Sequence, residues 1–290
     1  MRIALATCED PPVPDADAGP LSDALAELGA EAEQPAWNDS GVDWSSFDLV
    51  QLSSTWDYNQ RLGEFREWLG RVEGETRLEN PRELVEWNLD KRYLAELAEA
   101  EVPIIPTVWS EVGEEGEAAE EAARRGWKRI VVKPVVDLGA QRLRRVGPNE
   151  VAAALEEIGE PSLVQPFLGS IGRSGELSIA FFRGELSHAI LKRPAEGEFR
   201  IHEHFGGTYK PVEPPPSAVE VTDHVIALLA AGEVGPASLP GTPPLYARVD
   251  LVSGPRGEPC VIEVELIEPA FYLHVAGPEA AARFAAHLVE

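Results

Sequence analysis

The sequence predicts an α/β protein, with some α+β character, in which a small N-terminal α/β unit precedes a longer region of hairpins and helices. Residues 2–7, 20–29 and 48–53 follow one another as apolar strand, amphipathic helix and apolar strand. Near the other end, two alternating apolar runs at residues 246–252 and 259–267 flank a stretch rich in turn-forming residues, so they should pair as an antiparallel hairpin. A chain of 290 residues is long enough for two or three subdomains around one cleft.

The N-terminal unit places a polar and aromatic loop at the carboxyl end of its second strand. Ligand sites of open α/β sheets lie at such strand ends. Trp56, Asp57 and Tyr58 in this loop are therefore candidates for substrate contact, and packing of the loop onto the core is the alternative of equal weight. A helix over residues 64–72 follows.

The middle of the chain alternates strands and helices around a glycine-containing loop. We expect Asn80 to cap a helix whose first residue is Pro81, and Asn88 to provide a second cap, because asparagine is a poor interior helix residue. The loop at residues 137–141 contains Gly139. The other expected elements are an extended segment at 102–107, an acidic helix at 114–125, strands at 129–134, through 146 and at 162–167, and a helix at 148–158.

The last third of the chain is expected to contain a second hairpin. Residues 176–182 and 185–191 alternate around Arg183-Gly184. A proline-rich linker at 211–216 and helices at 218–231 and 278–288 complete the pattern.

Composition limits the partners of the chain. Its 50 acidic and 25 basic residues give a net charge of −25, which repels nucleic acid and anionic membranes, so an anionic ligand needs a local basic pocket. No run approaches the roughly 20 apolar residues of a membrane span, and the N-terminus has no signal-peptide pattern, so we expect a cytoplasmic location. Cys8 and Cys260 lack the spacing of a metal site and are interpreted as buried thiols.

The predicted hairpin at residues 246–267 brings charged groups together. Residues i and i+2 of a strand share a face, so Arg248 and Asp250 point the same way, as do Glu263 and Glu265 on the partner strand. Three carboxylates beside one guanidinium are unfavourable to desolvate unless a cation neutralises them. Hard oxygen ligands of this kind suit magnesium that already carries phosphates.

Several motifs occur in an order that resembles the ATP-grasp superfamily. They are a lysine after a capping asparagine, a strand ending Val-Val-Lys-Pro, the glycine loop, a Gln-Pro-Phe-Leu strand end, a Gly-Glu-Leu-Ser hairpin and the Arg-x-Asp and Glu-x-Glu strands. The resemblance covers about residues 80–269. It implies an N-terminal α/β domain at 1–88, a small ATP-grasp subdomain with a lid at 89–169 and a C-terminal subdomain at 170–290 that carries the metal-binding hairpin, with ATP bound between the two subdomains.

The resemblance implies a role for each matching residue. Lys91 and Lys133 would hold the phosphates of ATP, the loop around Gly139 would close over them, and Glu176 would contact the nucleotide. Arg248 would stabilise charge on the transferred phosphate. The adenine pocket would be formed by Gln165, Phe167 and Leu168, and Mg²⁺ would be bound by Asp250, Glu263 and Glu265. Two departures are notable: the lid has fewer glycines than is usual, and Glu265 stands where the family usually has asparagine.

A closer resemblance is to the small ATP-grasp ligases related to prokaryotic glutathione synthetase, and most of all to the O-ureido-D-serine cyclo-ligases that form D-cycloserine. It rests on Glu-Trp-Asn-Leu-Asp-Lys-Arg-Tyr-Leu and on the ending Glu-Val-Glu-Leu-Ile-Glu-Pro. It implies an antibiotic-biosynthesis enzyme that activates a carboxylate as an acyl phosphate, which a nitrogen of the same molecule attacks. Ring closure would exploit a high effective molarity.

The substrate side of the site is less defined by sequence. Lys192 and Arg200 offer the cations that a carboxylate substrate needs, and Gly206 and Gly207 lie in the same segment. Glu268 either orients Arg248 or the metal, or simply ends a strand. We expect the partner to be a small-molecule substrate. The sequence leaves the oligomeric state open, and a homodimer is the state that family members often adopt. An intermolecular amide ligase and a nucleotide-binding protein without catalysis remain the alternatives.

Overall fold

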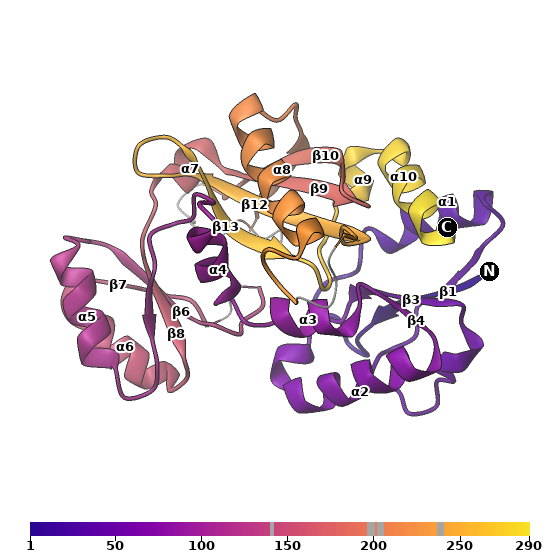
Figure 1. Cartoon of the computed structure of the whole chain (residues 1–290), viewed down its shortest axis with the longest axis horizontal. Helices are drawn as coiled ribbons and strands as arrows, with labels where there is room; N and C mark the ends of the chain where they lie inside the picture. Colours follow the sequence, from indigo (N-terminus) through magenta and orange to yellow (C-terminus); the bar gives the residue numbers. More distant parts are fainter. Residues whose placement is uncertain (140–141, 196–200, 202–205, 237–240) are drawn as a thin grey trace.

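The computed structural model describes residues 1–139, 142–195, 201, 206–236 and 241–290. Three sheets organise the described chain, and each has helices packed against it (Figure 1). The predicted α/β class is confirmed. None of the helices in these stretches combines the length and apolarity that crossing a membrane requires.

The N-terminal sheet is parallel, with the strand order β2-β1-β3-β4. Its strands are β1 (Arg2–Thr7), β2 (Glu31–Glu33), β3 (Leu49–Ser54) and β4 (Arg77–Glu79). Helix α1 (Ala18–Glu27) covers one face together with the C-terminal helix α10 (Pro278–Val289), and α2 (Leu62–Glu75) covers the other. Because both faces are covered, the inner strand β1 is apolar throughout its middle. The short strands β2 and β4 were not predicted.

The second sheet is antiparallel and covered on one face. Its order is β5-β8-β6-β7, formed by β5 (Val108–Ser110), β6 (Ile130–Pro134), β7 (Arg144–Val146) and β8 (Ser162–Pro166). Helices α5 (Glu115–Arg124) and α6 (Val151–Ile158), the latter preceded by the 3₁₀ turn η3 (Pro148–Glu150), bury Ile130 and Val132. Side chains alternate along a strand, so Val131 and Lys133 point to the opposite face, where they line a cavity.

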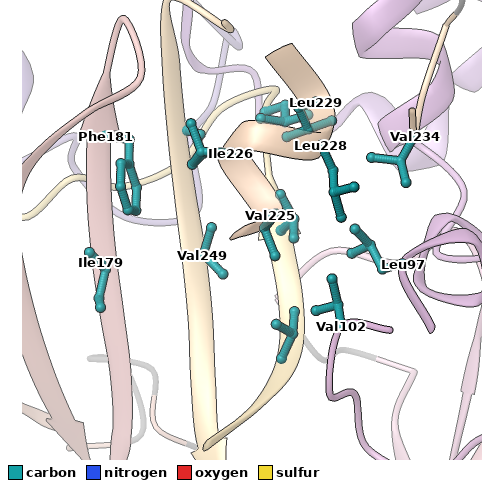
Figure 2. Close-up of a cluster of buried hydrophobic side chains, with 14 of the residues drawn as sticks. Leu97, Val102, Ile179, Phe181, Val225, Ile226, Leu228, Leu229, Val234 and Val249 are labelled. Atoms are coloured by element: carbon teal, nitrogen blue, oxygen red, sulfur yellow. The ribbon is translucent and has the colours of Figure 1, made fainter. Parts of the chain in front are cut away.

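The third sheet is antiparallel and carries both predicted hairpins. Its order is β11-β10-β9-β12-β13, with bounds β9 (Glu176–Phe182), β10 (Glu185–Arg193), β11 (Thr208–Pro211), β12 (Tyr246–Ser253) and β13 (Pro259–Glu265). Figure 2 shows Ile179 and Val249 on the strands facing Val225 of helix α8 (Pro216–Ala231). The residues next to Ile179 and Val249 in the sequence, namely Ser178, Arg248 and Asp250, therefore point to the other face of the sheet.

Helix α4 (Tyr93–Glu99) packs on this third sheet. Its Leu97, together with Val102 in the segment that follows, joins the apolar cluster beneath α8 (Figure 2). Tyr93 donates its hydroxyl to the backbone carbonyl of Val264 at 3.0 Å. The segment that carries Lys91 is thereby fixed against β13. The remaining helices are α3 (Arg82–Asn88), α7 (Ser170–Ser174) and α9 (Leu273–Ala276), with 3₁₀ turns η1 (Trp44–Ser46) and η2 (Tyr58–Gln60).

The two predicted asparagine caps are wrong. Helix α3 begins at Arg82 with Pro81 in the capping position, and Asn88 is its last residue. The side chain of Asn80 instead donates to the carbonyls of Tyr246 and Leu266 and accepts from the amide of Leu245. Asn88 likewise bonds the carbonyl of Val264 and the amide of Leu266. Both asparagines satisfy buried backbone groups of the third sheet, which a sequence-local cap rule cannot detect.

Candidate functional site

A cavity of about 460 Å³ lies between the second and third sheets and is closed at one end by N-terminal loops. A smaller cavity of about 100 Å³ shares Lys133, Gly139, Glu263 and Glu268 with it. The structure brings most of the predicted site residues to these walls. They are Trp56, Lys133, Gly139, Gln165, Phe167, Leu168, Glu176, Lys192, Arg248, Asp250, Glu263 and Glu265 in the larger cavity, and Tyr58 and Lys91 in the smaller one.

One end of the larger cavity is apolar. Leu168, Ile171 and Ile262 pack around buried Ile105 and Cys260. Gln165 lies beside them and donates to the Thr107 hydroxyl at 2.9 Å. The ring of Phe167 has the guanidinium groups of Arg129 and Arg145 at 4.8 and 5.2 Å from its centre. An apolar slot with a polar edge and adjacent cations has the chemistry of a site for a flat, anionic heterocyclic ligand.

The predicted hairpin places its charges as expected. Arg248 is opposite Glu265, and Asp250 is opposite Glu263, on strands that are confirmed as antiparallel neighbours. Arg248 holds Asp250 with two bonds of 2.9 and 2.8 Å and also binds Glu265. Its third nitrogen donates to the carbonyl of Ala270 at 2.9 Å. The guanidinium therefore has its donors divided between two carboxylates and the loop after β13.

Asp250 is the most fully bonded carboxylate of the site. Besides Arg248 it accepts from Ser178 at 2.5 Å and from Lys192 at 3.1 Å. Burial acts to raise the pKa of Asp250, but Arg248 and Lys192 outweigh it and hold the pKa below its ordinary value. Lys192 also pairs with Glu176 at 2.6 Å. Lys192 thus joins β9, β10 and β12 through a network of buried charges.

Two other carboxylates have pKa values near neutrality. Burial raises the pKa of Glu176 to about 7 against the opposing effect of Lys192. Burial likewise raises the pKa of Glu265 to about 7 despite the nearby Arg248. A low-dielectric site crowded with carboxylates produces this effect, because each ionised group disfavours ionisation of the next.

The two predicted phosphate-binding lysines differ in their partners. Lys91 pairs with Glu263 at 3.0 Å and donates to the carbonyl of Asp137 at 2.7 Å. Burial opposes the charge of Lys91, yet Glu263 raises its pKa. Lys133 has no ion pair or side-chain hydrogen bond within the described residues, and burial together with Lys91 lowers its pKa. A buried ammonium without a partner points to an anionic ligand.

The carboxylates fit a magnesium ion that arrives with phosphates. Their hard oxygens are the ligands Mg²⁺ prefers, and this ion commonly takes one or two carboxylates and completes its shell with phosphates and water. The described part of the chain contains no group of three or more potential ligands arranged around one point. Glu263 and Glu265 have side chains 30% and 26% exposed, whereas Asp250 is 3% exposed and its oxygens are taken by several donors.

The candidates for substrate contact are divided by the structure. Trp56 lines the larger cavity and Tyr58 the smaller one. Asp57 faces elsewhere, because its carboxylate accepts from Trp37 and pairs with Arg61, each at 2.6 Å. It is therefore not brought to the cavity.

The segment after β10 is only partly described. Gly206 and Gly207 line neither cavity, although Ile201 and Tyr209 on either side of them line the larger one. Gly206 has a φ of 79°, which favours glycine. Arg200 lies outside the described residues. Contact of this segment with the substrate therefore stays a prediction, and it is supported by Ile201 and Tyr209 rather than by Gly206 and Gly207.

Several cavity residues were missed by sequence reasoning. The loop from Pro12 to Asp17 after β1 forms one wall, and a loop at the carboxyl end of a parallel strand is a signal that could have identified it. Asp17 accepts from the amides of Tyr272 and Leu273 at 2.8 and 2.6 Å and from His274 at 3.1 Å. It thereby fixes Tyr272, whose φ of 56° is unusual for a tyrosine, in the opposite wall.

Comparison with known proteins identifies the family. The model of the family described as "D-cycloserine synthetase DcsG, N-terminal domain" matches residues 3–80. The cycloserine biosynthesis protein DcsG of Streptomyces lavendulae is 35% identical over 287 residues, which span 95% of this chain and 94% of that protein. The chain belongs to the DcsG family. Membership makes it an ATP-dependent ligase, as the closer sequence resemblance implied.

Solved structures agree with this assignment. The crystal structure of D-cycloserine synthetase DcsG matches with a TM-score of 0.89 and 33% identity, over 99% of this chain and 98% of that one. D-Alanine–D-alanine ligase of Bacillus anthracis, at 15% identity, matches with a TM-score of 0.69 over 100% of this chain and 96% of that one. The ATP-grasp ligase PsnB, at 18% identity, reaches 0.67 over 99% and 98%. The predicted ATP-grasp fold is confirmed.

Proposed function

We propose that this DcsG-family member is a Mg²⁺- and ATP-dependent cyclo-ligase. It activates the carboxylate of a small amino-acid-like molecule as an acyl phosphate, and a nitrogen of the same molecule displaces the phosphate to close a ring. O-ureido-D-serine is the proposed substrate and D-cycloserine the product, in antibiotic biosynthesis. The observation that carries the proposal is the buried ammonium of Lys133, which has no ion pair within the described residues and lies beside Lys91 and the paired carboxylates of the hairpin.

The cavity supports a division of the nucleotide between its two ends. The apolar slot of Leu168, Ile262 and Ile105 would take the adenine, with Gln165 at its edge and Phe167 beside it. The phosphates would reach Lys91 and Lys133, and the lid loop at Gly139, with a φ of 64°, would cover them. Glu176, paired with Lys192 behind the slot, would contact the nucleotide.

We propose that Glu263 and Glu265 offer their exposed oxygens to magnesium, and that Asp250 joins them by giving up one of its present donors. When bound, magnesium would supply charge neutralisation for the phosphates. Without magnesium, the protein's own cations neutralise these carboxylates, because Lys91 pairs with Glu263 and Arg248 pairs with Glu265. Both cations are then positioned beside the phosphates.

Arg248 and Lys192 would act on the transferred group. Arg248 is fixed by Asp250, Glu265 and the carbonyl of Ala270, so its planar fork needs little reorganisation to stabilise charge on a phosphoryl oxygen. Lys192 lies 5.7 Å from the ring centre of Tyr272 in the same wall. Trp56 and the loop at residues 12–17 would shape the space left for a small substrate.

We also retain the domain division at 1–88, 89–169 and 170–290. The three sheets, which lie within residues 2–79, 108–166 and 176–265, support it. Helix α4 (Tyr93–Glu99) packs on the third sheet. We therefore propose that the boundary at residue 89 holds along the sequence, whereas in space helix α4 moves with the C-terminal subdomain.

The test is substrate-dependent ADP release with O-ureido-D-serine as the only organic substrate besides ATP. A cyclo-ligase forms ADP, phosphate and D-cycloserine from this one substrate, and water releases the carbamoyl group of the substrate as CO₂ and NH₃. ADP formation only when a carboxylate and a separate amine are both supplied would replace the proposal by an intermolecular amide ligase. ATP binding without ADP formation over a panel of amino-acid-like substrates would refute catalysis.

A further inference from the structure

Glu268 differs from Glu263 and Glu265 in having no ion pair among the residues that the structure describes. It is 5% exposed and lines both cavities, at their junction. Its Oε2 atom is buried and has no hydrogen-bond partner within the described residues. A buried carboxylate oxygen without a donor is strongly unfavourable, so it is retained in a cavity wall where a ligand can supply the donor.

Tyr58 and the backbone of Glu268 are held by the N-terminal region. Tyr58 lines the smaller cavity with Glu268, lies close enough to its carboxylate to act on its pKa, and stacks on Phe65 in the N-terminal core with ring centres 4.9 Å apart. The backbone carbonyl of Glu268 accepts from the indole of Trp56 at 3.4 Å. The free oxygen is therefore oriented by the N-terminal domain.

The charged groups that face Glu268 favour a donor rather than an anion in this place. Glu265 and Glu263 face it from β13, and Lys91, which already pairs with Glu263, is the cation on that side. Burial raises the pKa of Glu268 well above its ordinary value, and Glu265 adds to this effect. A phosphate or carboxylate group here would meet the carboxylates of Glu263 and Glu265, whereas an N–H group would find an acceptor oxygen, and the positive charge that develops on the attacking nitrogen would favour the ionised form of Glu268.

Building on the function proposed above, we propose that Glu268, oriented by Tyr58, receives the N–H group of the attacking nitrogen and takes its proton. The nitrogen lone pair forms the new bond to the acyl carbon. The bond from that carbon to the phosphate oxygen breaks, and phosphate leaves with the bonding electrons. The proton lost from nitrogen moves to Oε2 of Glu268, and water then releases the carbamoyl group that remains on this nitrogen as CO₂ and NH₃.

The location agrees with this role. Glu268 lies where the wall with Lys91 and Lys133 meets the wall with Trp56, loop 12–17 and Tyr272. An acyl phosphate would form at this boundary between phosphate and substrate groups. The nitrogen that attacks it must come from the substrate side, within reach of Glu268.

The experiment separates carboxylate activation from ring closure. Glu268→Gln and wild type are incubated with O-ureido-D-serine, Mg²⁺ and ATP, with and without hydroxylamine. Hydroxylamine is largely unprotonated at neutral pH and traps an acyl phosphate as a hydroxamate without an enzymic base. We expect D-cycloserine formation by Glu268→Gln to fall by about 10²-fold or more, in the range of general-base catalysis, while hydroxamate formation stays within about threefold of wild type.

Two further variants control for indirect effects. Tyr58→Phe keeps the ring that stacks on Phe65 and should slow ring closure by about tenfold, because Glu268 loses the neighbouring hydroxyl that acts on its carboxylate. Glu258→Gln makes the same chemical change in the turn of the β12–β13 hairpin, away from both cavities, and should retain both activities.

The outcomes are distinguishable. Equal loss of hydroxamate and D-cycloserine in Glu268→Gln would overturn the inference and place Glu268 in carboxylate activation or folding. Wild-type rates of D-cycloserine formation in that variant would also overturn it. Absence of both products with wild type would instead refute the proposed function itself.

Discussion

The carboxylates of strand β13 and the carboxylate in the loop that follows it contrast sharply. Glu263 and Glu265 are each paired with a cation, Lys91 and Arg248 respectively. Glu268, three residues after Glu265, has a buried oxygen without a hydrogen-bond partner in the part of the chain that the structure describes. The same contrast exists between Lys91, which is paired, and Lys133, which has no ion pair among those residues. The paired groups build a stable network, and the unpaired groups mark the places where a ligand must complete the structure.

Removal of the metal is expected to have the largest effect on activity, and it tests whether the paired carboxylates need the metal for stability. Chelation of Mg²⁺ with EDTA should abolish ADP formation, because phosphates would no longer be neutralised. The melting temperature of the ligand-free protein should not change, since Lys91, Lys192 and Arg248 already balance the carboxylates. Calorimetry and an ADP assay check the two results. A large fall in melting temperature would mean that the metal is structural.

Removing a paired carboxylate should have the next largest effect. Glu263→Ala should lower kcat by about 10²- to 10³-fold with the fold retained, because it removes a proposed metal oxygen and frees Lys91. Asp250→Ala should do the same and also leave Arg248 and Lys192 without their shared partner. Steady-state kinetics with circular dichroism measure this. Undiminished turnover in both variants would refute the proposed site.

The two lysines allow a matched comparison of stability. Lys91→Met should lower the free energy of unfolding by about 2 kcal/mol, less than for a fully buried pair because the Glu263 side chain is 30% exposed. Lys133→Met should leave it unchanged or raise it, because it removes an ammonium that has no partner. Urea unfolding measures both. Equal destabilisation would show that Lys133 is paired after all.

The smallest expected effect concerns the loop that positions the substrate wall. Asp17→Ala removes the acceptor of the Tyr272 and Leu273 amides, so the wall with Tyr272 should loosen. We expect the KM for the organic substrate to rise by about tenfold and the KM for ATP to stay nearly constant. An equal rise in both constants would mean that Asp17 supports the whole cavity. Asp15→Ala in the same loop removes the acceptor of the Ser53 hydroxyl and of the Asp17 and Ala18 amides, so it should raise the KM for the organic substrate in the same direction as Asp17→Ala.

Sequence reasoning succeeded where local pattern and pairing agree. Alternation predicted both hairpins of the third sheet, and it predicted that Arg248 and Asp250 share one face of their strand and Glu263 and Glu265 one face of theirs, while the cross-strand register came from the structure. It failed where a side chain serves a distant backbone group. Asn80 and Asn88 were expected as caps but bond strands more than 160 residues away. Asp57 was expected in the site and instead pairs with Trp37 and Arg61.

The sequence alone determined the order of motifs, the charged face of the β12–β13 hairpin and the positions of Lys91 and Lys133, because periodicity and spacing are properties of consecutive residues. Only the tertiary structure decided which charges are neutralised by partners. That depends on contacts between segments far apart in the chain, such as Lys91 with Glu263 and Lys192 with Asp250. Desolvation acts on a group according to everything packed around it, so the unpaired oxygen of Glu268 became visible only in the folded chain.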